Sequence, residues 1–180
     1  MFPELQTDRL LLREITPHDR EDIFSCFSNE DVVKHYGQEA FTDMAQAEAL
    51  IDFFSKSYRE NKGIRWGIAR KEIPGLIGTV GFNALSIKHR RAEIGYELHP
   101  DYWRKGYTSE AVTAVLRYGF NELGLTRIGA VVFTENDASN QLLTKLGFER
   151  EGVLRDYMVQ NGIAYDTYVY SSLKNSLPSF

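Results

Sequence analysis

A short basic segment in the middle of the chain has the residue types that bind an anion. The sequence reads "HPDYWRKGYTSEA" from His99 to Ala111, so Arg104, Lys105 and Gly106 stand just before an apolar pattern at helical spacing. A helix N-terminus offers free backbone N–H groups and the positive end of the helix dipole, and it binds phosphate where the backbone can approach closely. The segment is therefore either an anion-binding loop or a solvated glycine turn, and its own residues do not decide which.

The composition bounds the class of protein. A chain of 180 residues with 43% hydrophobic and 26% charged residues is typical of one soluble globular domain, here expected to span residues 1–180. The net charge of -4 argues against a globally basic surface for nucleic acid. The single cysteine, Cys26, cannot form an intrachain disulfide and fits a reducing compartment. With no signal-peptide core and no apolar run near the ~20 residues of a membrane span, we expect a cytoplasmic protein.

The titratable residues outside this segment show no metal or thiol site. The spacing of the four histidines is not that of metal ligands, so we expect no metal. Cys26 lies on the apolar face of a predicted helix, which favours a core position over a nucleophile. Trp66 alternates with Ile64 and Ile68 and is expected in the core or in a pocket wall.

Apolar periodicity predicts the order β-α-α-β-β-β-α-β-α-β-β. Strands are expected at residues 7–16, 64–71, 76–85, 91–99 and 126–134, with two more inside 149–173 joined at Asn161-Gly162. Helices are expected at residues 16–29, 42–61, 108–124 and 137–148, the first two capped by Thr16 and Thr42. This order predicts an α/β fold with a mixed, mostly antiparallel sheet of about seven strands and helices on both faces, not a doubly wound parallel sheet.

Several segments together resemble one family. The segments are "TDRLLLRE", "LIGTVGF", "AEIGYEL", "GYTSEA" and "ENDASNQLLTKLGFEREG". In order and spacing they resemble the GNAT N-acetyltransferase superfamily, in the branch of the ribosomal-protein N-terminal acetyltransferases, over about residues 7–173. The family's loop pattern is Gln/Arg-x-x-Gly-x-Gly/Ala; Gly106 matches its central glycine, whereas Trp103 and Thr108 depart from its two ends.

The resemblance implies acetyl-CoA as the co-substrate and a sheet whose central parallel strands splay apart around it. Backbone groups of Tyr96 and Leu98 would pair with the pantetheine arm. The side chains of Asn136 and Asn140 would lie near that arm, and an Arg104 or Lys105 side chain would neutralise a phosphate. The pyrophosphate would be held by backbone N–H groups of Arg104, Lys105, Gly106, Tyr107, Thr108 and Ser109.

The resemblance also implies catalytic roles for three residues. Glu93 is the first candidate for the general base, and its alternative is a solvated carboxylate or a partner of Arg91. Glu97 lies on the same strand face and is the second candidate. Ser139 would donate to the leaving thiolate, unless it only caps its helix.

One position departs from the relatives of this branch. They carry a glutamate on the strand after "EG", and the position expected to correspond to it in this chain is Met158. Asp156 and Tyr157 are nearby substitutes, so the identity of the base stays open.

The acceptor is expected to be a primary amine. An α-amine, with an ordinary pKa of about 7.7–8, needs less help to lose its proton than a lysine near 10.4, which favours the N-terminus of a protein. The resemblance implies a ribosomal protein as that acceptor. The alternatives are a small amine (polyamine, amino acid or aminoglycoside) and a non-catalytic acyl-CoA-binding domain. His35 and Tyr36 line the acceptor pocket or belong to a surface loop. We expect no direct nucleic-acid or membrane partner, and a monomer or homodimer.

Overall fold

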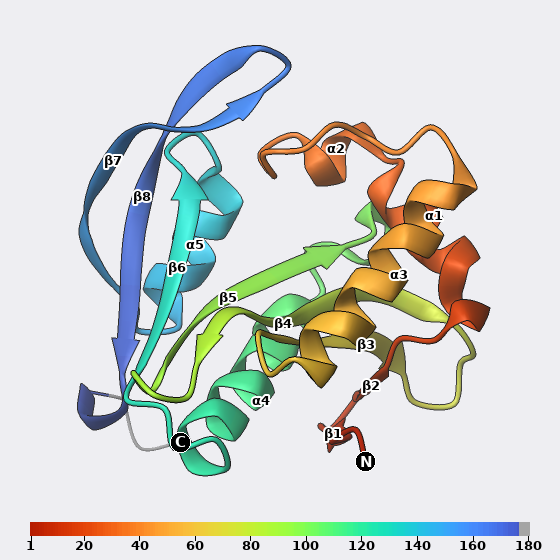
Figure 1. The fold of residues 1–180 in the computed structure, drawn as a ribbon, viewed down its shortest axis with the longest axis horizontal. Coiled ribbons are helices and arrows are strands. Elements are labelled where there is room, and N and C mark those ends of the chain that lie inside the picture. Colours follow the sequence, from red (N-terminus) through yellow and green to blue (C-terminus); the bar gives the residue numbers. More distant parts are fainter. Residues whose placement is uncertain (177–180) are drawn as a thin grey trace.

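An eight-stranded sheet in the order β1-β2-β3-β4-β5-β6-β8-β7 organises residues 1–176, the part of the chain that this computed structural model describes (Figure 1). The strands are β1 (Leu5–Gln6), β2 (Leu10–Glu14), β3 (Ile64–Arg70), β4 (Leu76–Ser86), β5 (Arg91–Leu98), β6 (Arg127–Phe133), β7 (Glu149–Gln160) and β8 (Ile163–Leu173). The α-helices are α1 (Arg20–Phe27), α2 (Glu30–Val33), α3 (Met44–Arg59), α4 (Tyr107–Asn121) and α5 (Asp137–Lys145). Short 3-10 helices are η1 (Pro17–Asp19), η2 (Pro100–Tyr102) and η3 (Lys174–Ser176).

The predicted mixed, mostly antiparallel sheet is confirmed, with local corrections. The sheet gains an eighth strand because the two-residue β1 pairs with β2 through Leu5 and Leu12. The short helix α2 was not predicted. Helix α3 begins after Asp43 rather than Thr42, since the Asp43 side chain accepts a hydrogen bond from Ala45 N at 2.8 Å. The Asn161-Gly162 turn is confirmed, with both residues at positive φ (51° and 74°).

Helices cover both faces of the sheet because strand side chains alternate between them. On β3, Ile64, Trp66 and Ile68 join the core under α4, and Trp66 is fully buried, as predicted for the core. The α4 residues of that core recur at helical spacing: Ala111, Val112, Val115, Leu116 and Phe120.

The opposite face packs against α1 and α3. Its core includes Ile23, Cys26 and Phe27 from α1 and Ile51 and Phe54 from α3. Cys26 is 2% exposed, and burial raises the pKa of its thiol, which supports the predicted core position.

The only parallel pair of the described sheet is short. Strands β5 and β6 pair from Arg91 opposite Arg127 to Glu93 opposite Gly129 and then diverge, as Figure 1 shows. Each strand keeps its other neighbour: β5 pairs with β4 up to Leu98, and β6 pairs with β8 up to Phe133. The sheet is therefore splayed at its parallel strands, as the resemblance implied.

Membrane-spanning length is not reached by any helix within residues 1–176: none is both long enough and apolar enough to cross a bilayer.

The contact of α4 with the sheet depends on Gly119. A Cβ at this position would lie 2.7 Å from the Phe82 ring and 3.0 Å from Ile128 Cδ1, both in the core. We predict that Gly119→Ala lowers the free energy of unfolding by about 1–2 kcal/mol, because overpacking outweighs the gain of about 1 kcal/mol in helix propensity. Urea unfolding measures the change. Gly152→Ala, where a Cβ would meet nothing within 4 Å, is the control, and a stabilised Gly119→Ala would contradict the packing argument.

Candidate active site

Backbone groups of β5 face the gap between β5 and β6. His99 N donates to Ile77 O at 2.8 Å, and His99 continues the β5 ladder with β4. Because backbone groups alternate sides along a strand, the odd-numbered residues of β5 bond to β4 and the even-numbered ones point the other way. The N–H and C=O groups of Tyr96 and the N–H of Leu98 therefore point to where β6 has already turned away. These are the residues that the resemblance assigned to pantetheine.

The strand leads directly into the predicted anion loop. Trp103 Nε1 donates to Leu98 O at 2.7 Å, which folds the loop back onto the end of β5. Arg104 and Gly106 have positive φ values of 61° and 78°, and Gly106 is the N-cap of α4. The bond from Glu110 N to Gly106 O starts the helix, so earlier N–H groups of the first turn have no intrahelical partner. The left-handed conformation explains the glycine at position 106.

The basic side chains of the loop contribute differently. Lys105 Nζ donates to Asp101 O at 2.9 Å, so its charge is turned back toward η2. Arg104 is exposed. Of these two side chains, Arg104 is therefore the one that is placed for the predicted contact with a phosphate in this conformation.

A clamp from the N-terminal segment holds the start of α4. Arg9 Nε pairs with Glu110 Oε2 at 2.7 Å, and Arg9 Nη1 donates to Lys105 O at 2.8 Å. Thr7 Oγ1 donates to Glu110 Oε1 at 2.5 Å. Partial burial alone would raise the pKa of Glu110, but the hydrogen bonds from Thr7 and Arg9 hold it below its ordinary value. Residues about a hundred positions apart thus fix the loop.

Two hydroxyl groups meet on the α4 side of the gap. The Tyr96 hydroxyl and Ser139 Oγ lie 2.5 Å apart and share a hydrogen bond. Burial is the main cause that raises the pKa of Tyr96 to about 12, and the Ser139 hydrogen bond offsets it only in part. The phenol is therefore protonated at neutral pH. Within residues 1–176 no other side-chain hydrogen bond joins β5 beyond Glu93 to β6 or α5.

Ser139 and the two asparagines sit at the start of α5. Asn136 is the N-cap, and its Oδ1 accepts from Ser139 N at 3.3 Å, so the serine hydroxyl is not the cap. Asn140 Nδ2 donates to Phe133 O at 3.2 Å, and its Oδ1 accepts from Tyr170 at 2.7 Å. The structure therefore uses the Asn140 side chain to fasten α5 to β6 and β8.

The two candidate glutamates share the face of β5 that looks toward α1 and α3, but their surroundings differ. Glu93 is partly exposed and stands opposite Asn83 of β4, at the last pair before the splay. Glu97 is 4% exposed, accepts a hydrogen bond from Thr79 and lies 3.5 Å from Arg65 Nη1. Only Glu93 is accessible to an incoming group in this conformation.

The segment after α2 crosses above both splayed strands. The His35 ring lies 6.0 Å from the Phe133 ring at the end of β6. Burial first, and then the neighbouring Glu97, raise the pKa of Tyr36 well above its ordinary value. Gln160 of β7 fastens this segment, since it accepts from Gly37 N at 3.0 Å and donates to Val33 O at 2.8 Å. His35 and Tyr36 therefore belong to a segment that is fastened over the splayed strands, and their role in the acceptor pocket stays a prediction.

Met158, expected where relatives carry a glutamate, lies against this same segment. Its Sδ would be 3.1 Å from a Cβ at Gly37, so the thioether closes the contact between the hairpin tip and the α2 segment. Asp156 is exposed, and its N–H donates to Asp166 Oδ1 at 2.8 Å.

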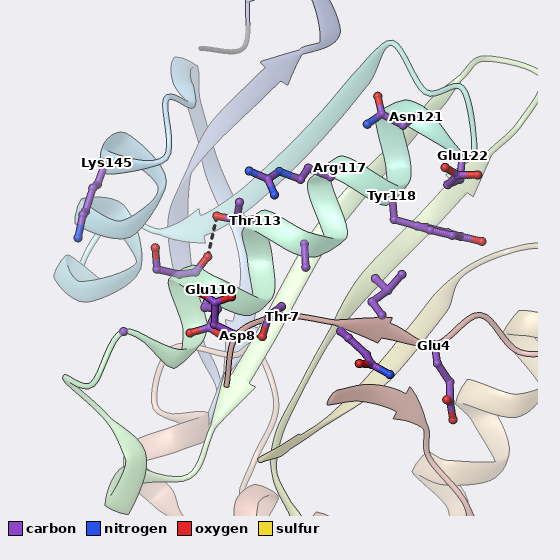
Figure 2. Close-up of a pocket in the computed structure, with 15 residues that line it drawn as sticks. Glu4, Thr7, Asp8, Glu110, Thr113, Arg117, Tyr118, Asn121, Glu122 and Lys145 are labelled. Carbon is purple, nitrogen blue, oxygen red and sulfur yellow. Dashed lines mark hydrogen bonds between the residues drawn. The ribbon is translucent and has the colours of Figure 1, made fainter. Parts of the chain in front are cut away.

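A groove of about 850 Å³ runs along the outer side of α4 from Gly106 (Figure 2). Figure 2 shows Arg117 extending from α4 on the side of α5, which carries Lys145. The dashed hydrogen bond from Thr113 Oγ1 to Ser109 O, 2.8 Å long, lies between these two cations and the Gly106 loop.

The cations of this groove, Arg117 and Lys145, and the Arg9–Glu110 clamp were not predicted from the sequence. Arg117 and Lys145 are ordinary outward positions of amphipathic helices, and no local pattern marks them. Arg9 and Glu110 find each other only in the folded chain. Within residues 1–176, no group of three or more His, Cys, Asp or Glu side chains is placed to hold a metal ion.

Comparison with known proteins relates this geometry to a family. Residues 9–149 match the family described as "Acetyltransferase (GNAT) domain". The chain is 59% identical to the uncharacterized N-acetyltransferase YoaA of Bacillus subtilis (strain 168), over 97% of this chain and 98% of the relative. It is 31% identical, over 71% and 68%, to YdaF of the same organism, provisionally named a ribosomal N-acetyltransferase. The crystal structure of spermidine N-acetyltransferase from Vibrio cholerae with CoA and spermine matches with a TM-score of 0.83 and 25% identity, over 94% and 98%.

The Arg9–Glu110 clamp predicts a pH dependence of stability. A carboxylate whose pKa is lowered by folding adds stability above its unfolded pKa of about 4.3, and that stability is lost as the pH falls through the folded value. We predict that Glu110→Gln lowers the free energy of unfolding by about 1.5 kcal/mol at pH 7, and that the difference from wild type shrinks below about pH 4. Urea unfolding across pH measures this difference, with Glu122→Gln at the C-cap of the same helix as the control. A difference that stays constant or grows in acid would contradict the clamp.

Proposed function

This chain belongs to the GNAT acetyltransferase family and is an N-acetyltransferase, and we propose that its acceptor is the N-terminal α-amine of a protein, with ribosomal proteins as the first class to test. The observation that supports this proposal is the gap between β5 and β6. Backbone groups of Tyr96 and Leu98 face this gap without a partner strand, and the chain continues from them directly into the Gly106 loop. We propose residues 1–180 as a single domain acting in the cytoplasm.

The residues present fit acetyl-CoA, which supplies an activated acetyl group. Pantetheine carries amides, and the free N–H and C=O groups of Tyr96 with the N–H of Leu98 are ladder partners for them. The N–H groups of the α4 first turn suit the pyrophosphate, together with those of Arg104 and Lys105. Gly106 leaves that approach open.

We extend the cofactor site along the outer groove. Thr113 and Arg117 follow Ser109 on successive turns of α4, and Lys145 stands on α5. The positive charges of Arg117 and Lys145 suit the remaining phosphate of CoA. Asn136 and Asn140 would act by fixing the start of α5, on which Ser139 is carried.

The chemical roles follow from accessibility. In the transfer, the amine nitrogen bonds to the acetyl carbon, the carbon–sulfur bond breaks and the amine loses a proton. Glu93 is placed to accept that proton, directly or through a water. Glu97 is buried under Arg65, and we propose that it has an indirect role, in which it holds this face of β5 in place. Ser139 donates to the sulfur, and Tyr96 orients its hydroxyl.

A second acceptor class stays open on a specific finding. The Vibrio cholerae protein of similar fold is a spermidine N-acetyltransferase, so a polyamine is the alternative acceptor. Release of CoA from acetyl-CoA, measured against a panel of N-terminal peptides and small amines by mass spectrometry, decides. Faster turnover of peptides supports the proposal, and turnover of polyamines alone would contradict it.

The proposed base predicts different fates for the two glutamates. Glu93→Gln should lower kcat/KM about 100-fold near pH 7, and the rate should recover as rising pH supplies free amine. Glu97→Gln should instead lower the melting temperature, because Arg65 loses its buried partner, while the pH profile keeps its shape. The pH profiles of kcat/KM together with thermal melts separate them. A changed profile in Glu97→Gln with an unchanged one in Glu93→Gln would reverse the assignment.

The Tyr96–Ser139 pair predicts the ionisation of bound CoA. A hydroxyl that donates to the sulfur favours the thiolate, so the pKa of the bound thiol should fall below its ordinary value of about 8.5. Ser139→Ala should raise that pKa by about one unit, and Tyr96→Phe by a smaller amount, because Ser139 loses its orientation. Titration of the ultraviolet thiolate absorbance measures it without any acceptor. Thr144→Ala, a hydroxyl on the same helix that bonds to Asn140 O, is the control. Identical titrations in all variants would remove both roles.

A further inference from the structure

A hollow of about 380 Å³ lies between α3 and strands β3 and β4, on the face of the sheet that carries Glu93. Its walls are mostly apolar, with Phe53, Phe54 and Leu85 among them. Phe53 stands at its rim with 59% of its surface exposed, which is unusual for so large an apolar side chain. The volume is at the small end of the range of about 300–1,000 Å³ for small-ligand pockets, so it suits one or two residues and not a folded partner.

The polar part of the lining is cationic and has unused donors. Arg65 is 5% exposed, and its Nη2 donates to Asn83 Oδ1 at 3.0 Å. Its Nε and Nη1 are buried with no hydrogen-bond partner within residues 1–176, although Nη1 lies 3.5 Å from Glu97. A buried guanidinium with free N–H groups favours a ligand that brings an acceptor oxygen.

No carboxylate lines the hollow within the described part of the chain. Lys62 is the second cation of the lining, and Glu60, which lies outside the hollow, pairs with it at 2.6 Å. A second ammonium group of an acceptor would therefore meet two cations here and no carboxylate of the lining. The lining suits an uncharged, apolar group next to a carbonyl oxygen.

The hollow is connected to the reacting end of β5. Asn83 stands directly opposite Glu93 on the neighbouring strand, and such facing side chains have Cβ atoms about 4.5–5.5 Å apart. A Cβ at Gly95 would lie 3.0 Å from Asn83 Nδ2 and 3.1 Å from Arg65 Nη2. These polar groups of the hollow thus stand over β5 just beyond the last β5–β6 pair, beside the proposed base.

We propose that this hollow binds the first residue of the acceptor peptide and selects an apolar side chain there. The side chain enters between Phe53 and Leu85, the first peptide carbonyl accepts from Arg65, and the α-amine faces Glu93. The inference rests on the proposed function and narrows it to peptides with an apolar first residue. Polyamines are disfavoured because their further ammonium groups would lie against Arg65 and Lys62.

The test is a specificity measurement on the intact protein. Acetyl-CoA-dependent kcat/KM is measured for peptides that differ only in a first residue of Leu, Phe, Ser, Asp or Lys, and for spermidine. We expect Leu and Phe to exceed Asp and Lys by about tenfold or more. Phe53→Asp should lower kcat/KM for the Leu peptide about tenfold, mainly through KM for the peptide, with KM for acetyl-CoA unchanged. It should lower the value for the Lys peptide less.

Ile73→Asp is the matched control, because Ile73 is 46% exposed in the β3–β4 turn and does not line the hollow. Equal kcat/KM for all first residues, a preference for spermidine, or the same effect from both Asp variants would overturn the inference while leaving an active acetyltransferase. Absence of turnover with every amine is a different result, because it would contradict the proposed function and the inference with it.

Discussion

Backbone pairing between β5 and β6 stops at Glu93 and Gly129, and the geometry of the site depends on that break. A strand inside a sheet normally bonds on both sides, and an unpaired buried backbone group is costly. Here β4 holds one side of β5 to its end, while β6 leaves with β8. The open side of β5 is therefore a ladder edge inside the protein. An extended ligand with amides satisfies it as a strand would.

The other features of the site keep this edge in register with the groups around it. Trp103 returns the chain to Leu98, so the glycine loop begins where the edge ends. Arg9, about a hundred residues earlier in the chain, holds the start of α4 through its ion pair with Glu110. Within residues 1–176, the Tyr96–Ser139 pair is the one side-chain hydrogen bond across the gap, so it links the two halves of the sheet without closing the space between them. Strand β5 itself separates the face proposed for the acceptor, where Glu93 is partly exposed and Glu97 is buried, from the face proposed for the cofactor.

Local patterns in the sequence were sufficient for the elements and for part of the site. The periodicity of α4, the Gly106 turn and the alternation along β5 are short-range signals, and the structure has each of them. The splay followed from the resemblance, because no local pattern marks where two strands part. Asp43 in place of Thr42 shows the usual uncertainty of a helix end with two possible caps. Arg65 beside Glu97 could not be predicted, since only the folded sheet brings β3 and β5 side chains together.

A crystal structure of the protein with CoA tests the central claim most directly. The account predicts pantetheine between β5 and β6, with its amides bonded to backbone groups of Tyr96 and Leu98. The pyrophosphate should lie on the N–H groups that follow Gly106, and the sulfur should lie within hydrogen-bond reach of Ser139. CoA bound elsewhere, or a gap closed by renewed pairing of β5 with β6, would contradict the account.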